Sequence, residues 1–176
     1  MKMRPDLVLR DARREDLSEI VAIYNSAIPG GTAVADSAPA TLESRAAWFE
    51  EHDPSTRPLW VMQKGAAIIA WASLQSYSPQ PAFRRTAEVS LYVAEGHRGQ
   101  GYGTMLLSRL VERCPDLGVE VLMGVAFGHN DATLRLNRKI GFEQWGRLPK
   151  VADMDGVLRD LVIMGIDLRG HGGRLR

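Results

Sequence analysis

The sequence has 176 residues, of which 45% are hydrophobic and 24% charged, as expected for one globular domain with a real core. Its 22 lysines and arginines nearly balance 21 aspartates and glutamates, and the formal net charge of +1 creates no broad positive field for nucleic acid. The single cysteine, Cys114, cannot form an internal disulfide, which fits a reducing compartment. The longest apolar run, residues 66–72, is far shorter than the roughly 20 residues of a membrane span. We therefore expect a soluble, cytoplasmic protein with one domain over residues 1–169 and a flexible tail over 170–176.

Apolar periodicity predicts a strand, two helices and a hairpin in the first half of the chain. Apolar side chains recur at helical spacing from Glu15 to Ile28, and the following Pro29-Gly30-Gly31 ends that helix. Thr41 is a suitable N-cap for a second helix, and Lys64-Gly65 is a suitable hairpin turn. The elements expected here are a strand at 7–9, helices at 15–28 and after 41, and strands at 59–63 and 66–74.

The second half of the chain alternates strands with helices. Within 87–93 the apolar residues 87, 89, 91 and 93 fall on one face, and Glu88, Ser90 and Tyr92 fall on the other. A glycine-rich turn then leads into a helix, and later elements are expected at 119–127 (strand), 130–140 (helix), 142–148 (strand) and 158–168 (strand). The resulting order, β-α-α-β-β-β-α-β-α-β-β, predicts an α/β (α+β) fold with a mixed central sheet and helices on both faces.

Three glycines at alternate positions, Gly99, Gly101 and Gly103, join the strand that ends near Val93 to the next helix. Such a turn directs successive backbone N–H groups into one concavity, and the helix start adds the positive end of its dipole. This pattern is typical of a diphosphate site. No lysine follows the glycines, which excludes the nucleotide P-loop, and the GxGxG spacing differs from the GxGxxG dinucleotide fingerprint. A tight turn in which glycine serves geometry alone is the alternative.

The stretch from Arg98 to Gly103 resembles the pyrophosphate loop Q/R-x-x-G-x-G/A of the GNAT superfamily of acetyltransferases. The resemblance extends from Leu7 to Leu168, with Leu91-Tyr92-Val93 and the segment 136–142 where that family places them. Further motifs are similar to its phosphinothricin and methionine-sulfoximine acetyltransferase branch: Ile23-Tyr24-Asn25, Arg45-Ala46-Ala47-Trp48-Phe49, Thr86-Ala87-Glu88 and Leu158-Arg159-Asp160-Leu161.

This resemblance implies that the protein binds acetyl-CoA as acetyl donor. The strands at 87–93 and 119–127 would splay to admit the pantetheine arm, which pairs with the backbone around Val93. A backbone N–H near Leu91 or Tyr92 would polarise the thioester carbonyl. Asn130 is expected mainly to be a helix N-cap, and a contact with CoA is its second expected role. The implied diphosphate ligands are the backbone amides of Arg98, Gly99, Gly101, Gly103 and Thr104.

Glu88 is the candidate general base. It is the only acid on its strand, and the phosphinothricin branch carries a glutamate at this position. A carboxyl group with an ordinary pKa of about 4.3 needs a raised pKa or a water relay to take a proton near neutral pH. The alternatives are a solvated glutamate and an ion-pair partner for Arg84 or Arg85.

The group that protonates the leaving CoA thiolate is less well defined. Many relatives place a tyrosine four residues before the Gly-Phe pair, and the phosphinothricin branch often has a histidine there. This chain has Asn137, whose amide at most hydrogen-bonds the sulfur or the pantetheine. Tyr92 and water are the remaining candidates. The four histidines have no metal-ligand spacing, so no metal is expected.

The resemblance also implies that Tyr24 and Arg84 bind the substrate, with Arg84 holding a carboxylate. The branch's Trp-Arg-Pro is replaced here by Tyr77-Ser78-Pro79, and residues 152–155 are acidic where relatives tend to be basic. Both changes favour a less acidic, or even cationic, amine. We expect a homodimer that acetylates a small amino-acid-like amine. A protein N-terminal or lysine acetyltransferase and a non-catalytic acyl-CoA sensor are the alternatives.

Overall fold

The computed structural model describes residues 5–31, 33, 34, 36 and 38–169, so the predicted tail at 170–176 lies outside the described residues. Its centre is a seven-stranded sheet in the order β1-β2-β3-β4-β5-β7-β6. Neighbouring strands are antiparallel except β4 and β5, which are parallel. The strands are β1 (Leu7–Asp11), β2 (Leu59–Lys64), β3 (Ala67–Ser76), β4 (Thr86–Val93), β5 (Val121–Phe127), β6 (Glu143–Met154) and β7 (Val157–Asp167).

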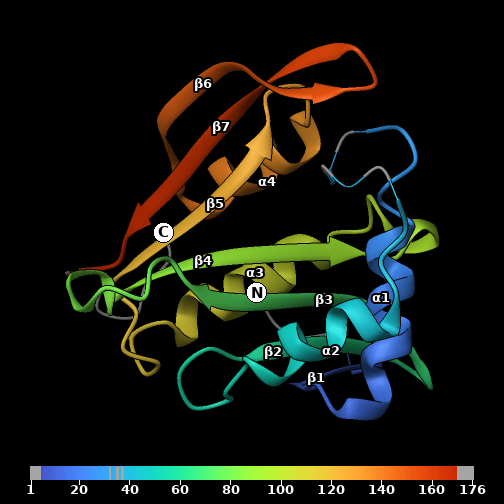
Figure 1. Cartoon of the computed structure of the whole chain (residues 1–176). Helices are drawn as coiled ribbons and strands as arrows, with labels where there is room; N and C mark the ends of the chain where they lie inside the picture. The colour runs from blue at the N-terminus through green and yellow to red at the C-terminus, as the bar shows by residue number, and fades with distance from the viewer. Residues whose placement is uncertain (1–4, 32, 35, 37, 170–176) are drawn as a thin grey trace.

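Helices cover both faces of this sheet (Figure 1). On one face lie α1 (Leu17–Asn25) and α2 (Leu42–Glu50), and on the other lie α3 (Tyr102–Arg113) and α4 (Asp131–Ile140). The predicted order of elements and the mixed sheet are thus confirmed. None of the described helices is both long and apolar enough to cross a membrane.

The first helix is shorter than the sequence predicts. Residues 14–16 form a separate 3-10 turn, because the Asp16 carboxylate accepts the backbone N–H of Arg13 at 2.7 Å and the guanidinium of Arg10 at 2.6 Å. At the other end α1 stops at Asn25, whose side chain is hydrogen-bonded at 2.9 Å to both the N–H and the C=O of Ala40. These side-chain contacts, local at the first end and long-range at the second, override the apolar helical pattern.

The hairpin of β6 and β7 is longer than predicted, because β6 continues to Met154. Its turn places Asp155 and Gly156 at φ values of 51° and 81°. Two consecutive left-handed residues match the twist of a two-residue hairpin. Much of β6 is exposed, so its pattern of side chains carries little of the burial signal that defines the central strands.

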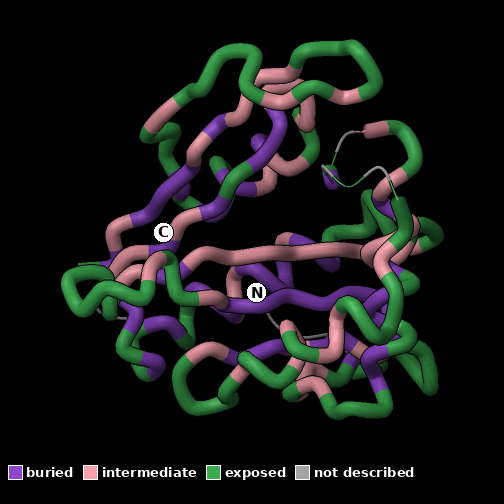
Figure 2. Tube along the Cα trace, viewed as in Figure 1, coloured by how far each residue is buried: buried purple, intermediate pink, exposed green. Residues whose placement is uncertain are grey.

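Two hydrophobic clusters hold the layers together. Figure 2 shows that β3 is buried along most of its length. The larger one packs α3 and α4 against the sheet, and Ala87, Val89, Leu91 and Val93 of β4 face it. The smaller one lies beneath α1 and α2, and Tyr92 packs there. The predicted alternation of β4 is therefore confirmed, with Tyr92 on the side opposite its apolar neighbours.

The sheet divides between β4 and β5. These strands pair over only three positions, from Thr86 opposite Val121 to Glu88 opposite Met123. Beyond Glu88 they separate, and Figure 1 shows β5, β7 and β6 leaning away from the half that contains β1 to β4. The predicted splay is confirmed, and it leaves one backbone edge of β4 without a partner strand.

Candidate functional site

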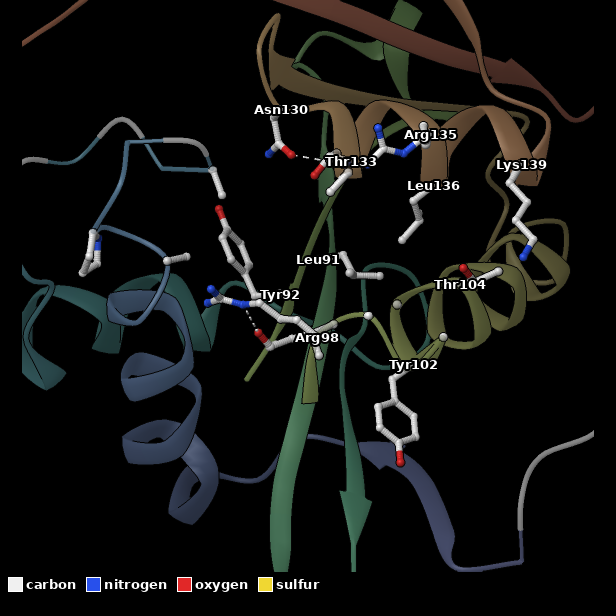
Figure 3. A pocket seen from close by; sticks show the side chains of 18 residues that line it. Leu91, Tyr92, Arg98, Tyr102, Thr104, Asn130, Thr133, Arg135, Leu136 and Lys139 are labelled. Carbon is white, nitrogen blue, oxygen red and sulfur yellow. Dashed lines mark hydrogen bonds between the residues drawn. The ribbon is translucent and has the colours of Figure 1, made fainter. Parts of the chain in front are cut away.

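A cavity of about 540 Å³ opens where β4 and β5 separate. One side is formed by the end of β4, the loop that begins at Arg98 and the first turn of α3, and the other side by one face of α4 (Figure 3). Its described lining residues include no acidic side chain. The cavity therefore suits an extended ligand that carries negative charge.

The glycine loop presents unoccupied backbone donors to this cavity. Gly99 and Gly101 have φ values of +74° and +85°, which L side chains rarely adopt, and a Cβ built on either meets nothing within 4 Å. Gly101 is the N-cap of α3 and supplies no capping side chain. Within the described residues, the N–H groups of Gly99, Gly101, Gly103 and Thr104 find no acceptor. They are therefore open to an anion at the positive end of the helix dipole.

Gly103 serves a different purpose from the other two glycines. A Cβ on Gly103 would lie 2.9 Å from Cδ1 of Leu136 and 3.4 Å from Cδ2 of Leu91. Because glycine has no Cβ, α3 can approach α4 and β4 closely. This approach forms the cradle, by which we mean the open N–H groups of Gly99, Gly101, Gly103 and Thr104. The alternative that glycine serves turn geometry alone therefore accounts for only part of the pattern.

The side chain of Arg98 connects its loop to the end of β4 and to the end of α1. Its Nε donates to the carbonyl of Val93 at 3.0 Å, and its Nη2 donates to the carbonyl and hydroxyl oxygens of Ser26 at 3.1 and 3.0 Å. Its backbone N–H donates to the carbonyl of Glu95 at 3.2 Å. The backbone N–H of Arg98 was predicted to bind a diphosphate, but this hydrogen bond already occupies it. The bond closes a 3-10 turn of residues 95–97, which the sequence does not indicate.

At the unpaired edge of β4, the exposed N–H and C=O groups are those of its odd-numbered residues. The N–H of Ala94 donates to Ile69 of β3 and the C=O of Thr86 accepts from Tyr77, so the even-numbered backbone groups face β3. The N–H of Leu91 consequently points into the gap toward β5, whereas the N–H of Tyr92 belongs to the ladder with β3. Of the two backbone donors suggested by the sequence, the geometry favours Leu91.

A second cavity of about 100 Å³ continues from the first into the slot between β4 and β5. The two share six lining residues, among them Leu91 and Tyr92 of β4 and Asn130 of α4. Glu88, Ser90 and Asn137 line only the inner one. The structure thus brings the predicted base and the predicted cofactor ligands into one continuous space.

Glu88 is half-buried, and burial raises the pKa of its carboxyl group above the ordinary value. No described residue hydrogen-bonds or pairs with this carboxylate. Arg85 pairs instead with Glu120, and Nη1 of Arg84 donates to the carbonyl of Pro81 at 3.4 Å. The ion-pair alternative for Glu88 is therefore not what the structure forms.

The two asparagines of α4 occupy different positions in this space. Asn130 is the N-cap of the helix, and its Oδ1 accepts the N–H of Thr133 at 3.1 Å, as the sequence predicts. Asn137 is buried and lines the inner cavity, and no side-chain hydrogen bond joins it to another described residue. Its amide is therefore available to a ligand in the slot.

Tyr92 lines both cavities on the side of α1, and Tyr24 packs against it from behind. Their rings meet edge to face at 5.2 Å, and Trp71 lies 4.7 Å from Tyr92. Burial raises the pKa of both tyrosines, and the Tyr24 hydroxyl donates to Asp36 at 2.6 Å. Arg45 lies 4.3 Å above the Tyr24 ring. Tyr24 thus contacts Tyr92 but lines neither of the two cavities.

Arg84 lies apart from the other predicted site residues. It lines a separate cavity of about 470 Å³ together with Arg57, Arg85 and the loop around Pro79. The described residues of one chain do not bring Arg84 and Glu88 into a common cavity. Its predicted contact with a substrate carboxylate stays a prediction.

One wall of the larger cavity was not predicted from the sequence. Ala132, Arg135, Leu136 and Lys139 of α4 line it together, at a spacing of i, i+3, i+4 and i+7. Helical periodicity could have placed them on one face. Nothing in the sequence indicates that this face borders a cavity rather than solvent. Within the described residues, no group of three or more His, Cys, Asp or Glu is placed to hold a metal ion.

An amide-lined cradle in a split sheet, joined to a narrow slot, suits a ligand that has a diphosphate and an extended arm. The profile of the acetyltransferase (GNAT) family matches residues 17–142. The chain belongs to this family.

Individual relatives are similar in sequence to this protein over nearly its whole length. It is 43% identical over 163 residues to YwnH of Bacillus subtilis, a match that covers 92% of this chain and 99% of YwnH. It is 36% identical over 161 residues to the L-methionine sulfoximine/L-methionine sulfone acetyltransferase of Pseudomonas aeruginosa, with 91% and 94% covered. The structure of the phosphinothricin acetyltransferase (Pat) of Sinorhizobium meliloti in complex with AcCoA matches with a TM-score of 0.86 at 30% identity, over 93% of this chain and 89% of that one.

Proposed function

We propose that the protein transfers an acetyl group from acetyl-CoA directly to the amine of a small amino-acid-like molecule, with Glu88 as general base. One observation carries this proposal. Glu88 is a half-buried carboxylate without a partner among the described residues, and it lies in the slot that continues the cradle cavity. The names of the Pseudomonas aeruginosa and Sinorhizobium meliloti relatives support an amino-acid-like acceptor.

The cradle fits the donor. Open amides at Gly99, Gly101, Gly103 and Thr104 suit a diphosphate, and the free edge of β4 suits an extended amide-containing arm that pairs like a strand. The N–H of Leu91 then hydrogen-bonds the thioester oxygen, where negative charge grows during attack. Bound acetyl-CoA supplies the activated acetyl group, and the chain supplies position and donors.

Glu88 acts on the incoming amine. Alkyl amines have a pKa of about 10, so most of the acceptor arrives protonated and must lose a proton before attack. A carboxylate whose pKa is raised by burial is a better proton acceptor than an exposed one, directly or through one water. Ser90 lies on the same face of β4 and lines the same slot, where it can hold such a water.

The departing thiolate needs little acid assistance. A thiol has a pKa of about 8.5, so the thiolate is a tolerable leaving group near neutral pH. Tyr92 keeps its proton because burial raises its pKa, and it can donate a hydrogen bond to the sulfur. Asn137, from the opposite wall, can donate a second one. Release into water completes the protonation.

We also propose that the active protein is a homodimer. Support comes from exposed apolar side chains on the β5-β7-β6 half of the sheet, where Val125 and Trp145 are each 46% exposed and Leu148 is 43% exposed. A second copy that covers this half would also place its own residues near the mouth of the slot. Tyr24 and Arg84 remain the proposed substrate contacts in that assembly.

The test is a thiol-release assay with acetyl-CoA against amino acids, polyamines and peptides, run beside calorimetry with CoA. Glu88→Gln is expected to lower the rate by a factor on the order of 100 or more, with CoA affinity nearly unchanged. Glu112→Gln, an exposed change on α3, is the matched control and should keep the full rate. Equal rates for Glu88→Gln and wild type would remove Glu88 from the mechanism. Turnover of peptides alone would favour a protein acetyltransferase, and binding without turnover of any amine would favour a sensor.

A further inference from the structure

Two buried polar atoms on the α2 side of the sheet have no hydrogen-bond partner among the described residues. They are Nε2 of His52, just after α2, and Oγ of Ser73 on β3, a residue that is 0% exposed. A buried polar atom without a partner costs free energy, so native proteins usually satisfy it with a protein group or a bound water. The mechanism proposed above uses neither residue.

Ser73 belongs to the same face of the sheet as the proposed base. In the antiparallel ladder of β3 and β4, Ser73 lies opposite Ser90 and Gln75 lies opposite Glu88. Residues directly opposite each other share a face, and their Cβ atoms are about 4.5–5.5 Å apart. Because Oγ of Ser73 is not hydrogen-bonded to Ser90, one water between the two hydroxyls would give it the missing partner.

His52 approaches this row of polar side chains from α2. The centroid of its ring lies 4.7 Å from that of Trp48, and the Trp48 ring lies 5.6 Å from that of Trp71. Trp71 is two residues before Ser73, on the same face of β3. His52 also lines a cavity of about 270 Å³ together with Gln75. The second unpartnered atom is therefore held at the end of the row that contains the first.

The hydrogen bond of His52 defines its tautomer. Nδ1 lies 2.8 Å from the carbonyl oxygen of Trp48, which can only accept, so Nδ1 carries the proton. Nε2 of the neutral ring is then a free lone pair, and thus a base. Burial lowers the pKa of His52 and raises that of Glu88, so the two values approach each other. A proton can pass between two such groups without being trapped on either.

The proton that Glu88 takes from the acceptor needs an exit, because the reacting molecules fill the slot in which Glu88 lies. We propose that the hydroxyls of Ser90 and Ser73, with water between them, form a proton path from Glu88 to His52. This inference rests on the proposed function and goes beyond it, since that function ends with the proton on Glu88.

Each step of this path moves one proton. Glu88 leaves the acetylation as a carboxylic acid and gives its proton to the first water or hydroxyl, which passes one of its own protons on. Nε2 of His52 accepts the last proton while Nδ1–H stays on the Trp48 carbonyl. The imidazolium then releases a proton into the cavity that its ring lines, together with Glu51 and Arg57. Glu88 is again a carboxylate, and every hydroxyl and water is restored.

Ser73→Ala tests the path with little effect on the fold. It removes a hydroxyl without a partner among the described residues, so the free energy of unfolding should stay the same or rise slightly. Thiol release from acetyl-CoA is measured with the panel amine that wild type acetylates fastest. The kcat should fall on the order of tenfold, with acetyl-CoA affinity unchanged. The solvent deuterium isotope effect on kcat should increase, because proton movement then limits the rate.

Ser76→Ala is the matched control. Ser76 lies on the same strand and lines the same cavity as His52, but it pairs with Ala87 and so belongs to the opposite face of the sheet. This variant should keep the wild-type rate and the wild-type isotope effect.

His52→Ala tests the end of the path by chemical rescue. Its kcat should also fall on the order of tenfold. The vacated volume adjoins the cavity of about 270 Å³, through which a small ring can enter. Added imidazole should restore the rate, whereas pyrazole, a ring of the same shape but a much weaker base, should not.

Other results would overturn the inference. A wild-type rate in Ser73→Ala or in His52→Ala would mean that no proton path through these residues limits turnover. An unchanged isotope effect in a slow Ser73→Ala, or equal rescue of His52→Ala by imidazole and pyrazole, would assign the residues to packing. In each case Glu88→Gln still loses its rate, so the proposed function survives. A wild-type rate in Glu88→Gln would overturn the proposed function and the path together.

Discussion

Replacing Gly101 by alanine tests the cradle at its most informative position. At a φ of +85° an L residue is strained, and the cost is about 1–2 kcal/mol. A shift of about 2–4 °C per kcal/mol is expected for a chain of this size, so the melting temperature should fall by roughly 2–8 °C. No atom lies within 4 Å of the added methyl group, so packing adds nothing to this loss.

The larger effect of Gly101→Ala falls on ligand binding. The methyl group enters the open space before the first turn of α3, where the diphosphate is proposed to lie. Losing one charge-assisted hydrogen bond costs about 1.5–3 kcal/mol, which corresponds to about 10- to 150-fold weaker binding of acetyl-CoA. Calorimetry measures the affinity, and a thermal melt without ligand measures the stability.

Gly96→Ala is the matched control for this change. Gly96 belongs to the same loop, has no left-handed φ and has nothing within 4 Å of an added Cβ. It should bind acetyl-CoA like wild type. Unchanged affinity in Gly101→Ala, or equal losses in both variants, would refute the argument that the space before α3 is occupied by the ligand.

Further changes test the packing, the base and the assembly. Gly103→Ala should lower the free energy of unfolding by about 1–3 kcal/mol through overpacking against Leu136, in denaturant melts, less any gain in helix propensity. Because the raised pKa of Glu88 means that the folded state disfavours its charged form, Glu88→Gln should be more stable than wild type above that pKa, and the difference should vanish on acidification below the ordinary value. The kcat/KM of wild type should fall as pH drops through the same pKa. A kcat/KM that stays constant over this pH range would contradict the role of Glu88. Trp145→Glu should convert the proposed dimer to a monomer in sedimentation, with no change expected if this face is free.

Local patterns predicted the inner parts of the protein well. Alternation alone placed Glu88 and Tyr92 on the face of β4 opposite Leu91, because each face of a central strand packs against a different helical layer. The glycine spacing likewise predicted the cradle, since left-handed φ values at Gly99 and Gly101 are a local requirement.

What the sequence could not predict depends on contacts between distant segments. The guanidinium of Arg98 is bound by Ser26, 72 residues away, and only the fold reveals that pairing. From the sequence, Arg135 and Lys139 are expected on an ordinary solvent-exposed helix face. A helix face that borders a cavity has the same polar sequence pattern as one that borders bulk water. Arg84, close to Glu88 in sequence, follows the turn at 81–83 and precedes β4, and it lines a different cavity.

The split of the sheet makes a residue-by-residue prediction for the backbone of β4. The amides of Ser90 and Tyr92 belong to the ladder with β3, so they should exchange slowly with solvent deuterium in the free protein. The amides of Leu91 and Val93 face the gap and should exchange quickly, although they lie on the same strand. Saturating acetyl-CoA should slow Leu91 and Val93 selectively, because a ligand arm that pairs with this edge replaces the missing strand. Amide-resolved exchange by NMR reports each position separately. A Leu91 amide that is already slow without ligand, or one that stays fast in the complex, would mean that the open edge of β4 is not where the donor binds.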